Sequence, residues 1–161
     1  YGPRDVDNFV SVFKATRLGV VPVFGDGSQE LSMVFAPDLA EALRLAGSTA
    51  GLEGRTYFVN HPEIVTSGDV VREIARAAGR EVRLLPLPRP VAELALGAAG
   101  GIASALGRKT ILRADKAHEF YQPAWTADAV PFMRDTGWAP RHALRPGLEA
   151  TWRWYREHGW L

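Results

Sequence analysis

Most of what the sequence says about its fold is concentrated in Phe24-Gly25-Asp26-Gly27-Ser28-Gln29 and in Ser32-Met33-Val34-Phe35-Ala36-Pro37-Asp38-Leu39-Ala40-Glu41-Ala42. Residues 20–24 form a short apolar run that ends at the turn sequence Gly-Asp-Gly, which predicts a strand followed by a turn. Residues 33–35 predict a second short strand. Asp38 then precedes apolar residues at helical spacing, and aspartate is a preferred helix N-cap. We therefore expect strand, turn, strand and helix in that order.

Helical patterns dominate the sequence on both sides of this segment. An apolar stripe at Val6, Phe9, Val10 and Phe13 predicts a helix over residues 5–18. Thr66 and Asp69 have the spacing of a capping box, which predicts a helix over residues 66–78. The remaining expected elements are strands over 56–59 and 82–85 and helices over 90–106, 114–120, 127–135 and 146–158. The fold class is therefore mixed α/β and mainly helical, without a sheet that is complete in itself.

Composition excludes several classes of function. The 161 residues carry a formal net charge of +1 and are 47% hydrophobic, so the chain can bury a core and has no overall basic surface for nucleic acid. It contains no cysteine, which excludes disulfides, thiol nucleophiles and cysteine-based zinc sites. The absence of cysteine is compatible with a cytoplasmic protein, which is our expectation.

The predicted helix over 90–106 is apolar on all sides, a property of helices that are buried, membrane-bound or covered by a ligand. A membrane span needs about 20 apolar residues, and this segment is shorter, contains Glu93 and is rich in glycine. We expect burial rather than stable membrane insertion. The pattern leaves open whether the helix is a lid, a dimer surface or core.

The familiar catalytic and cofactor motifs are absent. Gly25-Asp26-Gly27 supplies two glycines of a dinucleotide fingerprint, but Glu30 stands where the third glycine should be. None of the tyrosines has a lysine four positions later, and the four histidines lie far apart, so we predict no catalytic residue and no metal site. Asp38 is explained equally well as a functional carboxylate or as a helix cap.

Taken together, these residues resemble the C-terminal half of the extended short-chain dehydrogenases/reductases of the NAD-dependent epimerase/dehydratase type. Tyr1-Gly2-Pro3-Arg4 resembles the turn after the sixth strand of that family's nucleotide-binding sheet. The two runs quoted first resemble its GDGxQ and VxVxDLAxA segments. Gly54-Arg55-Thr56-Tyr57-Phe58-Val59 is similar to its next strand, Thr66-Ser67 to its following helix start, and Gly137-Trp138-Ala139-Pro140 with residues 147–156 to its C-terminal ending.

The resemblance implies that residues 1–161 are a single fragment that covers the substrate, and that residues 50–62 add a strand to a Rossmann sheet formed by an N-terminal half not present here. Because the chain begins at Tyr1 rather than methionine, we expect a piece of a longer protein. The parent would use NAD or NADP, bound mainly by that other half. Tyr1 and Pro3 would lie nearest the nicotinamide, and the fragment alone would be inactive.

One departure from the family narrows the implied substrate. Sugar-nucleotide members usually carry an arginine seven residues before the aspartate matched by Asp38, where it can hold a diphosphate, and this chain has Leu31 there. The implied parent is an oxidoreductase for an apolar alcohol or ketone, as in 3β-hydroxysteroid dehydrogenases and dihydroflavonol reductases. The residues expected in the substrate cleft are Asn8, Phe9, Phe13, Val23 and Asp38. For Phe9 and Phe13, a plain core role explains the same periodicity.

Two alternatives remain for the parent: a dinucleotide-binding sensor of the same fold, and a nucleotide-sugar epimerase or dehydratase. A third reading takes the chain as a binding module in its own right. The expected partners are a small-molecule substrate and the missing Rossmann half. Because an unpaired strand over 56–59 would invite self-association, either a homodimer or partial disorder of the isolated chain is also expected.

Overall fold

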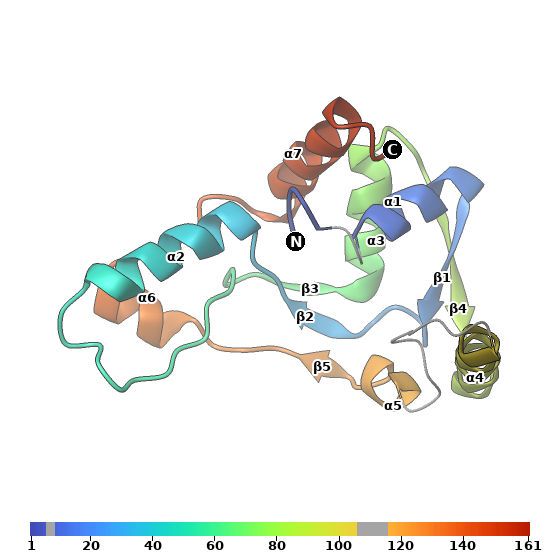
Figure 1. The fold of residues 1–161 in the computed structure, drawn as a ribbon, viewed down its shortest axis with the longest axis horizontal. Helices are drawn as coiled ribbons and strands as arrows, with labels where there is room; N and C mark the ends of the chain where they lie inside the picture. Colours follow the sequence, from blue (N-terminus) through green and yellow to red (C-terminus); the bar gives the residue numbers. More distant parts are fainter. Residues whose placement is uncertain (6–8, 106–115) are drawn as a thin grey trace.

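The computed structural model describes residues 1–5, 9–105 and 116–161, apart from the side chains of 99–105 and 116–117. Figure 1 shows α2 and α6 at one end of the molecule and β1, β4, α4 and α5 at the other, with α1, α3 and α7 grouped between them. The helices are α1 (Phe9–Ala15), α2 (Ala36–Ser48), α3 (Ser67–Ala77), α4 (Arg89–Ala105), α5 (Lys116–Phe120), α6 (Val130–Thr136) and α7 (Leu144–Glu157), with a 3-10 turn η1 (Thr16–Leu18) after α1. The strands are β1 (Val20–Phe24), β2 (Glu30–Ser32), β3 (Ile64–Thr66), β4 (Arg83–Leu87) and β5 (Ala124–Trp125).

The strands form two small sheets. In the first, β1 and β4 pair in parallel, with Val20 opposite Arg83 and Phe24 opposite Leu87. In the second, β2 lies between an antiparallel β3 and a parallel β5. The mixed, mainly helical α/β prediction is confirmed, because neither sheet has more than three strands.

The principal core lies where α1, α3 and α7 meet the second sheet. Phe13 is fully buried, stacked on Trp152 with 5.4 Å between ring centroids and edge-on to Tyr155 at 5.7 Å. The buried members of this core are Val10, Phe13, Val65, Val70, Ile74, Leu144, Leu148 and Tyr155. A smaller core joins α2 and α6 through Ala42, Phe132 and Trp138. The predicted apolar stripes of the first, third and last helices are therefore the surfaces that pack together.

Most of the predicted elements are present, and two local predictions are confirmed in detail. β1 occupies residues 20–24 as expected. The capping box at α3 is complete: Asp69 N donates to Thr66 Oγ1 at 3.1 Å, and Thr66 N donates to Asp69 Oδ2 at 3.3 Å. Two short strands, β3 and β5, were not predicted, because three or two residues are too few to show a period in sequence.

Two predicted strands are absent from the described structure. The strand expected over 33–35 lies at β2 instead, because β3 and β5 pair with residues 30–32 only. Beyond β2 the chain pairs with Tyr1: the Tyr1 amino group donates to Val34 O, and Ala36 N donates to Tyr1 O. Residues 56–59 form no regular element and have no strand partner among the described residues. Their pairing with a further sheet stays a prediction.

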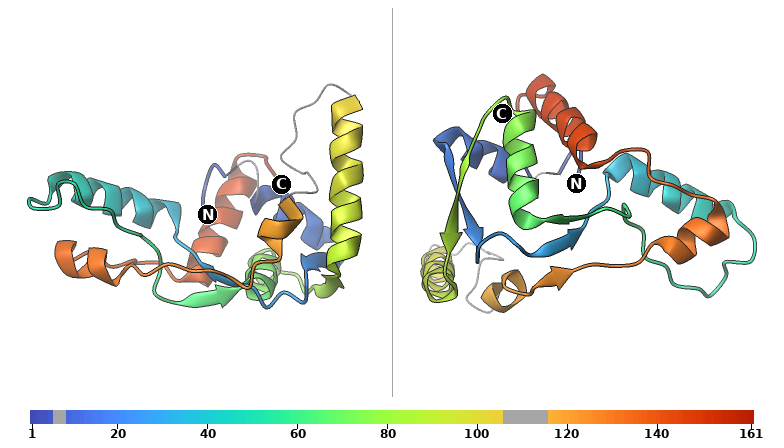
Figure 2. Two further views of the ribbon diagram at one scale, coloured as in Figure 1. Left: turned by 90° about the horizontal axis from the view of Figure 1, so that it is seen from below. Right: turned by 180° about the vertical axis from the view of Figure 1, so that it is seen from behind.

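The helix over 90–106 is present as α4. Figure 2 shows α4 at the edge of the molecule, beside β4 and away from α2 and α6. Ala92 and Leu96 are buried, whereas Val91 is 51% and Leu94 75% exposed. The expectation of general burial is therefore wrong for the described part of this helix. In the described residues, no helix has the length and apolarity needed to cross a membrane.

Candidate functional site

An apolar cavity of about 450 Å³ opens between β1, α1, α3 and the β5 region. It is lined by Ser11, Val12, Ala15, Val21, Pro22, Val23, Phe24, Gln29, Leu31, Ser67, Val71, Phe120 and Trp125. None of these lining residues carries a charge. Its size is within the range of small-molecule sites, which are concave and mostly apolar. This cavity is the candidate functional site.

Three aromatic residues form one wall of the cavity. Phe24, at the end of β1, stacks on Phe120 of α5 with 4.5 Å between ring centroids. Tyr121 holds α5 in place, because its hydroxyl donates to Leu87 O at the end of β4. Trp125 is opposite Leu31 in the β2–β5 pair and is 55% exposed. Apolar rings or chains would contact these flat surfaces favourably.

The polar side chains at the cavity already form hydrogen bonds within the protein. Gln29 donates from Nε2 to Phe24 O at 2.8 Å and accepts from Ser67 Oγ at 2.7 Å. These bonds tie the turn after β1 to the start of α3. A ligand in this cavity would thus meet an amide and a hydroxyl whose bonds are already formed, and it would find no charged side chain among the lining residues.

The glycines of the turn after β1 allow this turn to pack closely against the rest of the chain. Gly27 has φ +85°, and a Cβ there would lie 3.2 Å from Gly68 Cα and 3.3 Å from Val23 Cγ2. Gly27 O also accepts a hydrogen bond from Gly68 N at 2.8 Å. The turn therefore rests directly on the N-terminus of α3. These contacts occupy the space that a pyrophosphate would need, so the residues present do not form a dinucleotide cradle.

Of the predicted cleft residues, Val23 is the one that lines this cavity. Phe13 is fully buried and Phe9 packs against Tyr1, at 5.6 Å between ring centroids, on the core face of α1. The structure therefore places both in the core, which was the alternative explanation for their spacing. The cavity is lined instead by another face of α1, formed by Ser11, Val12 and Ala15. Asn8 lies outside the described residues.

Asp38 is buried, with 4% of its surface exposed, and it is not the helix cap considered from sequence, whereas a functional role of its carboxylate stays a prediction. The cap position of α2 belongs to Phe35, and Asp38 lies in the first helical turn. Its Oδ2 accepts hydrogen bonds from the backbone N–H groups of Arg141 and His142 at 3.2 and 3.0 Å. Asp38 thus anchors the segment before α7, and it is not among the residues that line the cavity.

Tyr1, expected near the nicotinamide, is half-buried between Phe9 and Phe35. Its hydroxyl lies 3.4 Å from both Ala143 O and Leu144 O at the start of α7. Burial, followed by the negative charges of Asp38 and Glu63, raises the pKa of this hydroxyl. A role of Tyr1 and Pro3 at a cofactor stays a prediction.

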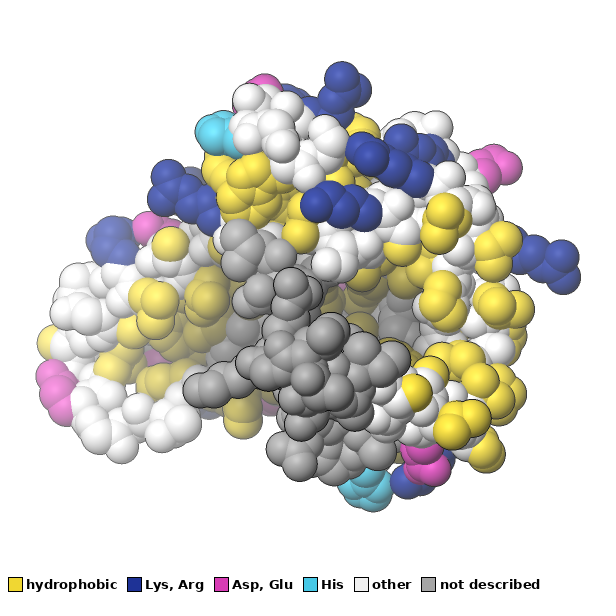
Figure 3. Space-filling view, turned by 45° about the vertical axis from the view of Figure 1, so that its right-hand side comes forward, with side chains coloured by type: hydrophobic (Ala, Val, Ile, Leu, Met, Phe, Trp, Pro, Cys, Tyr) yellow, Lys and Arg dark blue, Asp and Glu magenta, His cyan; other side chains and the backbone are white. Residues whose placement is uncertain are grey.

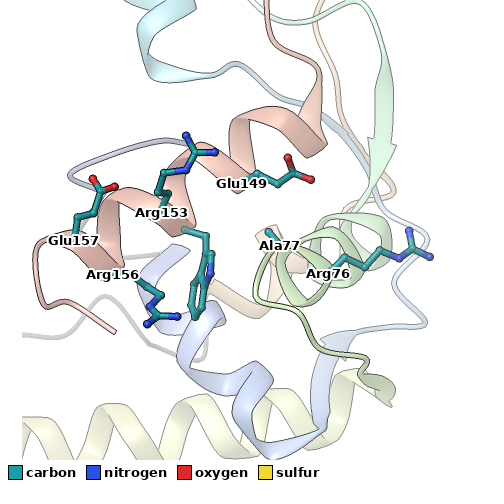
Figure 4. Close-up of a pocket in the computed structure, with 7 residues that line it drawn as sticks. Arg76, Ala77, Glu149, Arg153, Arg156 and Glu157 are labelled. Carbon is teal, nitrogen blue, oxygen red and sulfur yellow. The ribbon is translucent and has the colours of Figure 1, made fainter.

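A second, larger hollow of about 620 Å³ lies between α3 and α7. In Figure 4 its charged side chains diverge: Arg76 points away from the space that Glu149 faces, and Arg153 and Arg156 extend in opposite directions. The Trp152 ring is already covered by Arg80 at 5.6 Å and Arg156 at 6.0 Å. These groups do not converge on a common point. The apolar cavity is the better candidate.

Sequence reasoning missed most of the aromatic wall. Phe120 and Trp125 lie about a hundred residues after β1 in the chain, and only the fold brings them to Phe24. Leu31, which stands where the resemblance implies an arginine, is among the residues that line the cavity. In the described residues, no three histidine, aspartate or glutamate side chains are grouped so as to bind a metal ion.

Comparison with curated proteins gives relatives that include two dTDP-glucose 4,6-dehydratases. No protein-family model matches the chain. A dTDP-glucose 4,6-dehydratase of Neisseria gonorrhoeae is 27% identical over 161 residues, covering 98% of this chain and 42% of the relative. The corresponding enzyme of Neisseria meningitidis is 28% identical over 138 residues, covering 86% of this chain and 34% of the relative.

Solved structures show the same fold. A UDP-glucuronic acid 4-epimerase from Bacillus cereus in complex with NAD superposes with a TM-score of 0.68 at 17% identity, covering 98% of this chain and 42% of that one. A dTDP-glucose 4,6-dehydratase from Bacillus anthracis in complex with NAD gives 0.66, at 17% identity, over 99% of this chain and 43% of that one. RMD from Pseudomonas aeruginosa, complexed with NADPH, gives 0.67 at 16% identity, over 98% and 46%.

The chain is similar to part of these dehydratases and has the fold of part of the solved epimerases and dehydratases, and a C-terminal fragment of an extended short-chain dehydrogenase/reductase fits both findings. It spans less than half the length of the relatives it matches. The structures it resembles contain NAD or NADPH, whereas the turn described above offers no cradle for a dinucleotide.

Proposed function

We propose that this chain is the substrate-covering part of an NAD(P)-dependent oxidoreductase or epimerase, and that its cavity receives an apolar, uncharged part of the substrate. The observation that carries the proposal is the described lining of the cavity, which combines an aromatic wall with aliphatic side chains and includes no charged residue in the part of the chain that the structure describes. Burying a phosphate among such groups without a charged partner would be costly. An apolar alcohol or ketone is the substrate class that this lining supports best.

Leu31 is the residue on which the proposal depends most. It lines the cavity at the position where sugar-nucleotide members of the family usually have an arginine. Among residues 1–5, 9–105 and 116–161, no lysine or arginine lines the cavity to replace that charge. The nicotinamide of the cofactor would transfer the hydride. This chain would orient the substrate and exclude water from it.

A nucleotide-sugar substrate is the second candidate, and the relatives favour it. Both Neisseria relatives are dTDP-glucose 4,6-dehydratases. Under this alternative a nucleotide base or sugar would stack on Phe24, Phe120 or Trp125, and the diphosphate would be bound by residues outside this chain. A sensor that binds dinucleotide without turnover would share the fold but would lack the catalytic tyrosine and lysine.

The experiment is a substrate screen with the full-length protein that contains this chain. Oxidation of NADH and NADPH, and reduction of NAD and NADP, would be followed with a panel of apolar ketones and alcohols and with dTDP- and UDP-sugars. We expect turnover of apolar substrates. Binding of either cofactor without any turnover would favour the sensor, and turnover or tight selective binding of a nucleotide sugar would overturn the apolar proposal.

Two variants at Leu31 sharpen this test. Leu31→Arg places a charge in the cavity and is expected to lower kcat/KM for an apolar substrate by more than about tenfold, a loss that corresponds to 1.4 kcal/mol. Leu31→Met keeps the volume and the apolar character and is the matched control. Thermal unfolding of both variants separates a loss of binding from a loss of fold. If Leu31→Arg instead improved the binding of a nucleotide sugar alone, leaving apolar turnover intact, the cavity assignment would be wrong.

A further inference from the structure

Hydrogen bonds hold Gln29 in a fixed place at the wall of the apolar cavity. Its Nε2 donates to Phe24 O at 2.8 Å, and its Oε1 accepts from Ser67 Oγ at 2.7 Å. The backbone O of Gln29 also accepts from Ser67 N at 2.9 Å. A Cβ added to Gly25 would lie 2.8 Å from Gln29 Nε2, so the amide packs directly on the backbone of the turn after β1. Gln29, Phe24 and Ser67 all line the cavity.

The same bonds decide which groups of this amide remain available to a ligand. Phe24 O can only accept, so the amide group beside it is the NH2 and not the carbonyl oxygen. An amide nitrogen carries two N–H groups, and the bond to Phe24 O uses one of them. In the part of the chain that the structure describes, the second N–H of Gln29 has no acceptor. The cavity wall therefore offers one N–H donor that the fold itself does not use.

A free N–H selects for a different ligand group than a free lone pair does. The carbonyl oxygen of Gln29 already accepts one hydrogen bond, and a carbonyl with a single bond is tolerated inside proteins. An N–H that is buried without an acceptor is rare, because it loses its bond to water and gains nothing in return. A ligand that displaces water from Gln29 is thus favoured when it brings an oxygen that can accept this N–H.

The amide of Gln29 lies beside the aromatic wall of the cavity. Phe24, whose backbone O accepts from Gln29, stacks on Phe120 with 4.5 Å between ring centroids. Tyr121 Cε1 lies 4.0 Å from the Cβ position on Gly25 that Gln29 Nε2 approaches to 2.8 Å. A flat ring that packs against this wall would have the amide near its edge. Hydrogen-bond donors approach a carbonyl oxygen close to the plane of its substituents, which suits a ring ketone.

We propose that Gln29 is a specificity-determining residue of the cavity, whose second N–H donates to a ketone or ether oxygen on an otherwise apolar ring ligand. The inference rests on the proposed function, because it takes the cavity to hold the apolar part of the substrate. It adds a requirement to that function, since a ring of pure hydrocarbon should be the poorer ligand. Gln29 binds and orients the ligand in this role, and no bond of the ligand is formed or broken there.

The test compares two ring molecules that differ by one oxygen, indane and 1-indanone, with the full-length protein that contains this chain. Titration calorimetry gives the dissociation constant of each molecule for the wild type and for Gln29→Met. Methionine keeps the length of the side chain and removes the N–H groups. We expect the ratio of the indane to the 1-indanone dissociation constant to fall by about tenfold in the variant. An unchanged ratio would overturn the inference.

A ratio is needed because apolar molecules have other surfaces to bind. Figure 3 shows hydrophobic side chains on the outer surface of the molecule, and Leu85 and Leu94 are 53% and 75% exposed. Binding at such surfaces does not respond to Gln29→Met, so a change in the ratio reports on the cavity. If neither molecule binds to the wild type, the proposed function fails together with this inference. If both bind and the ratio is the same in the variant, only this inference fails.

Ser67→Ala is the matched control. It breaks the bond between Ser67 Oγ and Gln29 Oε1, as Gln29→Met does, but it leaves the N–H groups of Gln29 in place. We expect a ratio close to the wild-type value, and a fall as large as that of Gln29→Met would overturn the inference by assigning the effect to a loosened turn. The infrared C=O stretch of bound 1-indanone should lie at lower frequency in the wild type than in Gln29→Met, because a hydrogen bond weakens the C=O bond. Equal frequencies would contradict the assignment.

Discussion

Asp38 and His142 are 104 residues apart in sequence, and Oδ1 of Asp38 lies 2.9 Å from Nδ1 of His142. Oδ2 of the same carboxylate accepts from two consecutive backbone N–H groups, those of Arg141 and His142. The indole N–H of Trp138 donates to Asp38 O at 3.2 Å. One buried residue of α2 thus fixes the path of the chain from α6 into α7.

Replacement of this carboxylate is expected to destabilise the fold. Asp38→Ala would leave the two backbone N–H groups without their acceptor, at a cost of about 1–3 kcal/mol for each buried group left unpaired. Denaturant unfolding should therefore show a loss of at least about 2 kcal/mol. Glu41→Ala, on the same helix, removes only the surface pair with Arg44 and should cost less than about 1 kcal/mol. If the two variants were equally stable, Asp38 would not be an anchor.

The turn after β1 should reject any side chain at Gly27. Gly27→Ala combines a positive φ with a Cβ placed 3.2 Å from Gly68 Cα, and we expect a loss of about 2–3 kcal/mol in the free energy of unfolding. Gly51→Ala isolates the conformational part, because Gly51 has φ +84° and nothing within 4 Å of the added Cβ. Its expected loss is about 1 kcal/mol. Similar losses in both variants would show that the contact with α3 contributes nothing.

Substitutions of Phe13 and Trp125 should distinguish a residue of the core from a residue of the cavity wall. Phe13→Ala removes a fully buried ring and is expected to cost about 3–5 kcal/mol of stability. Trp125→Ala removes a ring that is 55% exposed, so unfolding should change much less, while the KM for an apolar substrate of the full-length protein should rise. A Trp125→Ala variant that loses stability as Phe13→Ala does, with unchanged KM, would assign Trp125 to the core.

Acid should weaken the contact between residues 55–57 and α6 in a defined pH range. A hydrogen bond from Arg134, then one from Tyr57, lowers the pKa of Asp135 from 3.8 to about 2, and Arg55 adds a contact at 3.0 Å. Because the folded pKa is lower than the unfolded one, this contribution to stability is fully present above about pH 4 and is lost as the pH falls toward 2.

The difference in Tm between the wild type and Asp135→Asn measures this contribution. It should be constant near neutral pH and should shrink between pH 4 and pH 2, where the wild-type carboxylate itself becomes protonated. A difference that stays the same throughout that interval would mean that the charge of Asp135 does not stabilise the contact.

Local sequence was sufficient for the elements whose causes are local. The capping box of Thr66 and Asp69 and the apolar run of β1 are confirmed, because each depends on residues within a few positions of one another. The extended dehydrogenase/reductase resemblance likewise followed from the order of short motifs along the chain. Leu31, in place of an arginine, lines the apolar cavity, and the substrate class drawn from it stays a proposal.

The sequence by itself therefore determined the class of fold and the main helices. Tertiary structure decided the rest, since pairing partners and burial depend on residues distant in the chain. It gave Asp38 a role through Arg141 and His142, which periodicity cannot show. It brought Phe120 and Trp125 to the end of β1, and it left one apolar side of α4 exposed, because the helix has more apolar faces than β4 and α5 can cover.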